Sequence, residues 1–171
     1  MSGSILSTAI AGDTVLRYEL MDRIRPYGMR MMQQIYHPGS ATRPKKAATQ
    51  VSASAIPNPM VGGIPFEMSV AEIEEMVVAF GAAARRCREG GLDGVDLHAS
   101  SGYLIEQFLS PANNTRTDQY GGSLENRMRF LVQILDIVLA ALQTCIHPTP
   151  AGVPQIQDGH DVKTLLAGGP S

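Results

Sequence analysis

Two histidines stand where strands of the predicted fold end. His37 directly follows the mostly apolar segment 29–36, and His98 follows Val95, Asp96 and Leu97. In folds that alternate parallel strands with helices around a barrel, the carboxyl ends of the strands form the active face, so polar residues there can be catalytic. A histidine at a strand end can equally be a structural residue. The positions of these two histidines leave both interpretations open.

The segment before His37 is typical of a helix followed by a strand. Asp13 can cap a helix that ends at Pro26 and Gly28. Its apolar residues, at helical spacing, are Leu16, Leu20 and Ile24. The next run, residues 29–36, is short and lies between Gly28 and Pro38, which favours a buried strand. Residues 40–68 show no periodicity, so we expect a long loop there.

A helix, a strand and a second long helix follow this loop. Ser69 and Glu72 form a capping box, in which a hydroxyl and a carboxylate satisfy backbone donors at a helix start. The predicted buried face of that helix is Ile73, Met76, Val77, Phe80, Ala84 and Cys87. Residues 92–99 indicate a strand and 102–109 a helical turn. Ser123 caps a last helix with the apolar face Leu124, Met128, Leu131, Leu135, Val138 and Leu142. This alternation predicts an α/β fold with a parallel sheet.

Composition narrows the class of protein. The chain has 14 basic and 16 acidic side chains and a formal charge of -2, so it shows no electrostatic footprint for nucleic acid. Its two cysteines, Cys87 and Cys145, are too far apart for a metal-type pair and too few for a disulfide framework, which favours a reducing, cytoplasmic setting. No stretch reaches the roughly 18 apolar residues of a membrane span. We expect a small, roughly neutral ligand, no metal and no membrane.

A forty-residue block carries a resemblance to a known family. Residues 91–130, GLDGVDLHASSGYLIEQFLSPANNTRTDQYGGSLENRMRF, resemble the signature of the Old Yellow Enzyme and 2,4-dienoyl-CoA reductase family almost from end to end. Upstream, QQIYHPGS resembles the family's flavin-contacting strand, and the helix that begins after Ser69 resembles the one leading to the histidine strand. The resemblance runs from about residue 24 to about residue 142. It implies a partial TIM (β/α)8 barrel that contains only the middle strand–helix units.

The resemblance also implies an activity and a set of residues. It implies an FMN enzyme that reduces a carbonyl-activated C=C bond, in an α,β-unsaturated carbonyl or an enoyl thioester, with NADH or NADPH as reductant. Gln34 matches the glutamine that binds the flavin's pyrimidine edge, and His98 the histidine that contacts cofactor and substrate and donates to the carbonyl oxygen. Tyr103 matches the tyrosine that supplies a proton to the α-carbon. Ser101 departs from the family's usual Asn or His, which puts rate and substrate choice in doubt. His37 takes a supporting role.

Other matches have structural explanations at least as good as catalytic ones. For Gln34 the alternative is a strand-end amide without a ligand, and for Tyr103 a ring packed under a loop. Turn building and ion pairing explain a further set of matching residues, Asn114, Arg116, Asp118, Tyr120 and Glu125.

The chain offers only part of a barrel. A complete barrel needs about 250 residues and eight strand–helix units. We expect residues 1–145 to form the partial oxidoreductase domain and 146–171 a disordered tail unrelated to the family. Without the family's phosphate-binding strands, FMN binding should be weak and the fragment inactive, and open sheet edges should favour self-association. The alternative is a non-catalytic remnant that acts as an interaction or complementation module.

Overall fold

A computed structural model describes residues 14–43 and 49–143. The helices are α1 (Thr14–Ile24), α2 (Val70–Glu89), α3 (Leu104–Leu109) and α4 (Leu124–Gln143), and the 3-10 turns are η1 (Arg25–Tyr27) and η2 (Gly39–Ala41). The strands are β1 (Met32–Ile35), β2 (Val51–Ser52), β3 (Phe66–Glu67) and β4 (Gly94–Leu97). β1 pairs with β4 and β2 with β3, both in parallel. The predicted α/β alternation with parallel strands is confirmed.

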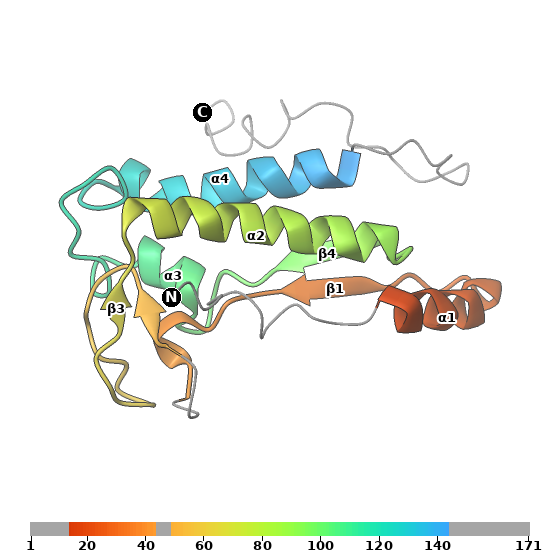
Figure 1. Cartoon of the computed structure of the whole chain (residues 1–171), viewed down its shortest axis with the longest axis horizontal. Coiled ribbons are helices and arrows are strands. Elements are labelled where there is room, and N and C mark those ends of the chain that lie inside the picture. The colour runs from red at the N-terminus through yellow and green to blue at the C-terminus, as the bar shows by residue number, and fades with distance from the viewer. Residues whose placement is uncertain (1–13, 44–48, 144–171) are drawn as a thin grey trace, which may run out of the picture.

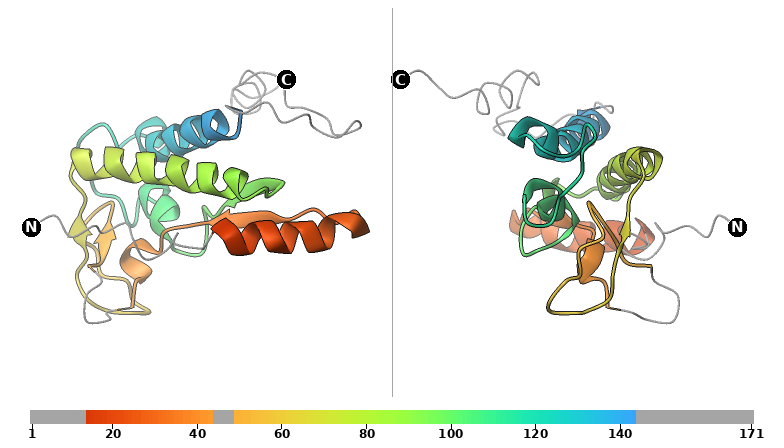
Figure 2. Two further views of the ribbon diagram at one scale, coloured as in Figure 1. Left: turned by 45° about the vertical axis from the view of Figure 1, so that its right-hand side comes forward. Right: turned by 90° about the vertical axis from the view of Figure 1, so that its left-hand side faces the viewer.

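Two long helices form a layer over one face of the β1–β4 pair (Figures 1 and 2). α2 begins at the predicted capping box: the Ser69 hydroxyl accepts a hydrogen bond from Glu72 N at 3.3 Å, and the Glu72 carboxylate accepts one from Ser69 N at 2.7 Å. Its buried residues are Ile73, Met76, Phe80, Gly81, Ala83, Ala84 and Cys87. The predicted face of α2 is therefore confirmed except at Val77, which is half-buried.

Among the described residues, helices cover one face of the β1–β4 pair and nothing covers the other, which we call the uncovered face. Ile35 is 4% exposed and packs in the core, where Val95 and Leu97 join it from β4. Side chains alternate along a strand, so Met32 and Gln34 point the other way, and Met32 is 61% exposed. The expected strand within 29–36 is confirmed, but its expected burial was wrong. The strand covers only 32–35, and among its residues only Ile35 is buried because helices pack against one face alone.

Three further expectations need correction. The segment 40–68 includes the end of η2 and two strands, β2 and β3, which are too short to leave a periodic pattern. On α4 the buried residues are Phe130, Ile134, Val138 and Ala141. Of the predicted face, Val138 is buried and Leu131 and Leu142 pack against the core, whereas Leu124 is 60% exposed. On α1, Met21 is buried and Leu20 is 40% exposed. In both helices the stripe that touches a neighbour is set by packing partners that periodicity does not identify.

The first helix ends where the sequence predicts. α1 ends in η1, and Gly28 follows in the left-handed conformation at φ 69°, so Pro26 and Gly28 end the helix as predicted. The expected cap Asp13, Cys145 and the expected tail 146–171 lie outside the described residues. None of the helices in the described part is long and apolar enough to cross a membrane.

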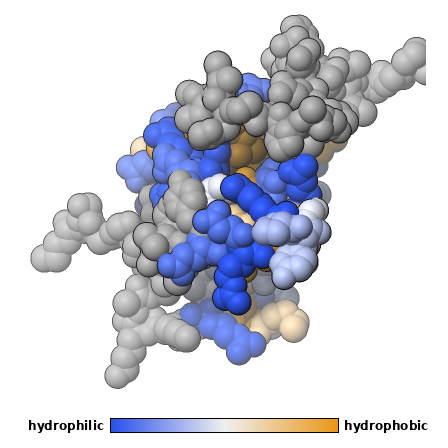
Figure 3. Space-filling view, turned by 90° about the vertical axis from the view of Figure 1, so that its right-hand side faces the viewer, coloured by the Kyte–Doolittle hydropathy of each residue, from blue (hydrophilic) through white to orange (hydrophobic). Residues whose placement is uncertain are grey.

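The end of the molecule at which β1 begins is viewed in Figure 3, and the described residues visible there are mostly hydrophilic. Arg30 pairs with Asp93 at 2.9 Å at this end, and Asp93 also accepts a hydrogen bond from Met31 N. These contacts fix the entrance of β1 beside the entrance of β4. The opposite end, where β1 and β4 finish, carries His37 and His98.

Candidate active site

Three rings meet at the carboxyl ends of β1 and β4. Tyr36 follows β1, His98 follows β4, and Tyr103 is the N-cap residue of α3. The ring centroids of His98 and Tyr103 are 4.9 Å apart, those of Tyr36 and Tyr103 are 5.4 Å apart and nearly stacked, and those of Tyr36 and His98 are 6.2 Å apart and edge-on. We call Tyr36, His98 and Tyr103 the ring cluster. It lies at the edge where active residues gather in parallel α/β folds.

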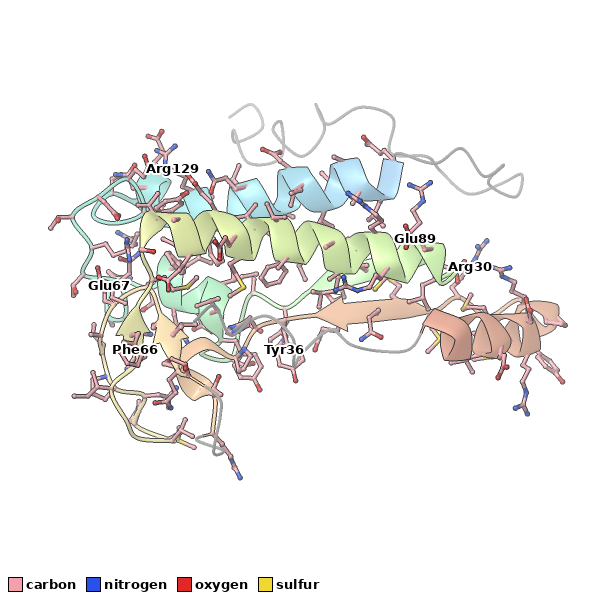
Figure 4. The ribbon with its side chains drawn as sticks, in the orientation of Figure 1. Arg30, Tyr36, Phe66, Glu67, Glu89 and Arg129 are labelled. Atoms are coloured by element: carbon pink, nitrogen blue, oxygen red, sulfur yellow. The ribbon has the colours of Figure 1, made fainter. Side chains whose placement is uncertain are left out.

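Strand register explains why the cluster forms. Ile35 pairs with Leu97, and His98 N donates to Ile35 O at 3.1 Å, so the residues that follow the two strands are neighbours. Alternation from the buried Ile35 puts Tyr36 on the uncovered face. Figure 4 shows Tyr36 on the side of β1 opposite α2. The structure thus brings together His98 and Tyr103, both predicted site residues, and adds Tyr36.

His98 has an orphaned polar atom. Its Nε2 is buried and has no hydrogen-bond partner among the described residues. Most buried polar groups in folded proteins are hydrogen-bonded, and each exception calls for an explanation. An unpartnered imidazole nitrogen beside the Tyr103 ring is a group able to hydrogen-bond a ligand atom that enters from the uncovered face.

Gln34 lies on the same uncovered face, one alternation before Tyr36. Its Nε2 donates to the Asp96 carboxylate at 2.7 Å, across the register pair of Gln34 with Asp96. Both residues are exposed. One amide N–H is used in this bond, which orients the side chain across the uncovered face.

His37 is held differently from His98. Its Nδ1 accepts a hydrogen bond from Gly39 N at 3.1 Å, and its carbonyl accepts one from Leu104 N at 2.9 Å. Burial lowers the pKa of His37 to about 4. The imidazole is therefore neutral at pH 7, and its contacts shape the loop after β1, which agrees with a supporting role.

Ser101 lies in a strained part of the loop between His98 and Tyr103. It is exposed and has φ 61°, which makes it the one residue other than glycine with a positive φ in the described chain. Its hydroxyl lies 3.5 Å from the Ser100 hydroxyl. The hydrogen-bond partner of the Ser101 side chain is therefore Ser100 and not His98. The structure does not bring Ser101 into the ring cluster.

The polar residues after α3 build turns. Asn114 is buried and its amide donates to the carbonyls of Phe108 and Tyr120, each at 2.7 Å. Arg116 is 7% exposed and donates to Ala53 O and Met68 O, at the ends of β2 and β3. Its hydrogen bonds to Asp118 lower the pKa of that carboxyl. The ion-pairing and turn-building explanation fits these positions.

The comparisons with known proteins agree with this geometry. The profile of the NADH:flavin oxidoreductase / NADH oxidase family matches residues 15–147. The chain belongs to this family. It is 41% identical over 120 residues to the NADH oxidase of Thermoanaerobacter brockii, covering 69% of this chain and 18% of that protein. It is also 41% identical over 123 residues to the NADPH dehydrogenase of Bacillus subtilis strain 168, covering 70% of this chain and 35% of that protein.

Solved structures extend the comparison to the fold. Morphinone reductase superimposes with a TM-score of 0.70 at 26% identity, over 76% of this chain and 40% of that one. The Old Yellow Enzyme homologue from Zymomonas mobilis superimposes with a TM-score of 0.71 at 26% identity, over 78% and 41%. The expected partial TIM barrel of the Old Yellow Enzyme type is confirmed. The chain spans less than half the length of each of these relatives.

Sequence reasoning missed Tyr36. The signal was available, because a strand residue two positions after Gln34 must lie on the same face as Gln34. The contact between Tyr36 and Tyr103 joins residues 67 positions apart in the chain, and no periodicity reports such a contact.

Proposed function

We propose that this chain carries the substrate-activating part of an FMN-dependent NAD(P)H oxidoreductase that reduces a carbonyl-activated C=C bond. The observation that carries the proposal is the buried, unpartnered Nε2 of His98 beside the ring of Tyr103. A donor and a proton source at one strand end are what the reduction of an enone or an enoyl thioester requires.

The side chains on the uncovered face fit the ring of a flavin. Gln34 is exposed there, and an amide offers both a donor and an acceptor to the pyrimidine edge. Asp96 orients this amide through the 2.7 Å hydrogen bond. When bound, FMN supplies the hydride chemistry, with NADH or NADPH as the source of the hydride.

His98 and Tyr103 perform the remaining steps. The Nε2–H of His98 donates to the substrate carbonyl oxygen, where negative charge develops as hydride reaches the β-carbon. A preorganised donor in a water-poor site is often the largest single catalytic contribution. The Tyr103 hydroxyl then gives its proton to the α-carbon, so one hydride and one proton saturate the double bond. Tyr36 stacks on Tyr103 and limits the orientations of its ring.

Flavin retention by these 171 residues is expected to be weak. The uncovered face that holds Gln34 also holds the Asp96 carboxylate, which repels an anionic phosphate group. The contacts available to FMN on this face are therefore those to the ring. This proposal concerns the chain by itself, and the residues of a longer protein would add to them.

A titration of the purified chain with FMN, followed by visible absorption, tests the proposal. We expect a saturable spectral shift at high FMN concentration, lost in Gln34→Leu and kept in the control Gln119→Leu, because Gln119 is an exposed amide outside β1 and β4. NADPH oxidation with a simple enone then tests turnover. Equal titrations for Gln34→Leu and wild type, or no shift at all, would contradict a flavin site on this face.

A non-catalytic role is the second candidate, and the strand edges that β1 and β4 leave unpaired within the described residues favour it. Met32 is 61% exposed there, and within the described residues β1 and β4 each pair with a single strand. An open strand edge can pair with another chain, so the face can serve in complementation or self-association. Met32→Lys should then lower the mass measured by light scattering at high concentration, and Met60→Lys, on a residue 92% exposed in the β2–β3 connection, should not.

A further inference from the structure

A buried glutamine lies next to the two loops that carry the ring cluster. Gln107 lies in α3 and is 1% exposed. Glutamine is seldom fully buried in proteins, and when it is, its polar atoms must find partners inside the fold. None of the roles proposed above uses this side chain.

The amide of Gln107 has all four of its hydrogen bonds. Its Oε1 accepts from Ser40 N at 3.1 Å and from the Ser52 hydroxyl at 3.0 Å. Its Nε2 donates to Pro38 O at 3.2 Å and to Gly102 O at 2.6 Å. A carboxamide can accept two and donate two hydrogen bonds, so its capacity is filled. The partners come from three separate segments: the loop after β1, strand β2 and the loop after β4.

The amide of Gln107 fits against the backbone at Gly39 because glycine has no side chain. Gly39 has φ 59°, and a Cβ on it would lie 2.2 Å from the Gln107 Oε1. A side chain at position 39 would therefore have to displace the amide from its partners. Glycine is required there both by the positive φ and by the close approach.

The partners of Gln107 adjoin the ring cluster. Pro38 and Ser40 lie just after Tyr36, and Gly102 directly precedes Tyr103. One amide thus ties together the two loops whose rings must meet. The loop after β4 has Ser101 and Gly102 at positive φ, and its other hydrogen bonds, such as Tyr103 N to Ser100 O, lie mostly within the segment.

We propose that Gln107 is a positioning residue, which sets the distance between the rings of Tyr36, His98 and Tyr103 and so the placement of the donor and the proton source. This inference rests on the proposed function for its catalytic meaning. The backbone bond from Leu104 N to His37 O joins the same two loops independently of any side chain. Loss of the Gln107 amide should therefore move the rings of the cluster while the protein stays folded.

Two substitutions separate positioning from packing. Gln107→Met keeps a side chain of similar volume and removes all four hydrogen bonds. Gln107→Glu keeps the two accepted bonds, loses the two donated ones and sets a carboxylate against Pro38 O and Gly102 O. Gln119→Met is the control, because it changes an exposed amide.

The readouts are the chemical shifts of the His98 ring by NMR and the near-UV circular dichroism of the tyrosines, which no tryptophan obscures because the chain has none. We expect both Gln107 variants to shift the His98 ring resonances toward random-coil values and to lose tyrosine signal, with far-UV helical signal kept. The control should match wild type. A fall in Tm with unchanged His98 shifts and unchanged tyrosine signal would overturn the proposal, because Gln107 would then only stabilise the fold.

A milder variant covers the case in which both substitutions unfold the chain. Ser52→Ala removes one of the four bonds, and it should move the same resonances in the same direction by less. Unchanged resonances in that variant would also overturn the proposal. These readouts need neither FMN nor substrate, so a failed FMN titration refutes the proposed function alone, and unmoved rings refute the positioning role alone.

Discussion

Acid should destabilise this protein through His37, well above the pH at which carboxylates titrate. Burial lowers the pKa of His37 to about 4, whereas in the unfolded chain it is near 6.5. Between these values the unfolded chain binds more protons than the folded one, so the free energy of unfolding falls as the pH falls. The contribution is fully present above pH 6.5 and is lost by about pH 4. It amounts to about 3 kcal/mol, at roughly 1.4 kcal/mol for each pH unit.

Urea unfolding at a series of pH values measures this loss. Wild type should lose stability steadily from pH 6.5 to pH 5, and His37→Asn, whose side chain can still accept the bond from Gly39 N, should lose much less. Glu72 and Asp118 contribute to the loss of stability only at more acid pH. Hydrogen bonds from Ser69 lower the pKa of Glu72 from 4.5, and hydrogen bonds from Arg116 lower the pKa of Asp118 from 3.8. Equal slopes for wild type and His37→Asn in that window, or an NMR titration of His37 near pH 6.5, would refute the reasoning.

Three substitutions test other parts of the structure. Ser101→Asn should raise stability by about 1 kcal/mol in thermal unfolding, because asparagine tolerates the left-handed backbone at φ 61°, whereas Ser100→Asn should not. Gly81→Ala should lower the free energy of unfolding by about 1–3 kcal/mol, although alanine favours helix, because its Cβ would lie 2.7 Å from Ile137 Cγ1. In an Ile137→Ala background the same substitution should lower it by less. Ser69→Ala should cost about 1 kcal/mol through loss of the α2 cap, and Ser69→Thr should keep most of the stability.

The helices could be predicted from the sequence where local chemistry decides them. The α2 start depends on Ser69 and Glu72, which lie within one turn of each other, so their reciprocal hydrogen bonds can be predicted from the sequence. The start of α4 is similar, since the Ser123 hydroxyl accepts from Asn126 N. The buried stripe of α4 was not predictable, because it is set by contacts with α2 and α3 such as Phe130 against Phe108.

The site was predictable only in part, because some of its contacts join residues far apart in the chain. Strand ends located His98, and the family resemblance supplied Tyr103, Gln34 and Ser101. The sequence could not show that Ser101 sits at a positive φ with its hydroxyl toward Ser100, because that depends on how the loop closes. It also could not show Gln107, whose four partners lie between 5 and 69 positions away along the chain.

The polarity of the uncovered face bears on which proposed function is better supported. Strands of a parallel sheet that are buried on both faces are near-continuous apolar runs. Here Ile35, Val95 and Leu97 face the helices, whereas Gln34 and Asp96 face away and bond to each other. A dry interface with another apolar core would bury this carboxylate at a high desolvation cost. A face of this kind suits a polar ligand and its water better than a second sheet, which favours the flavin site over the complementation role.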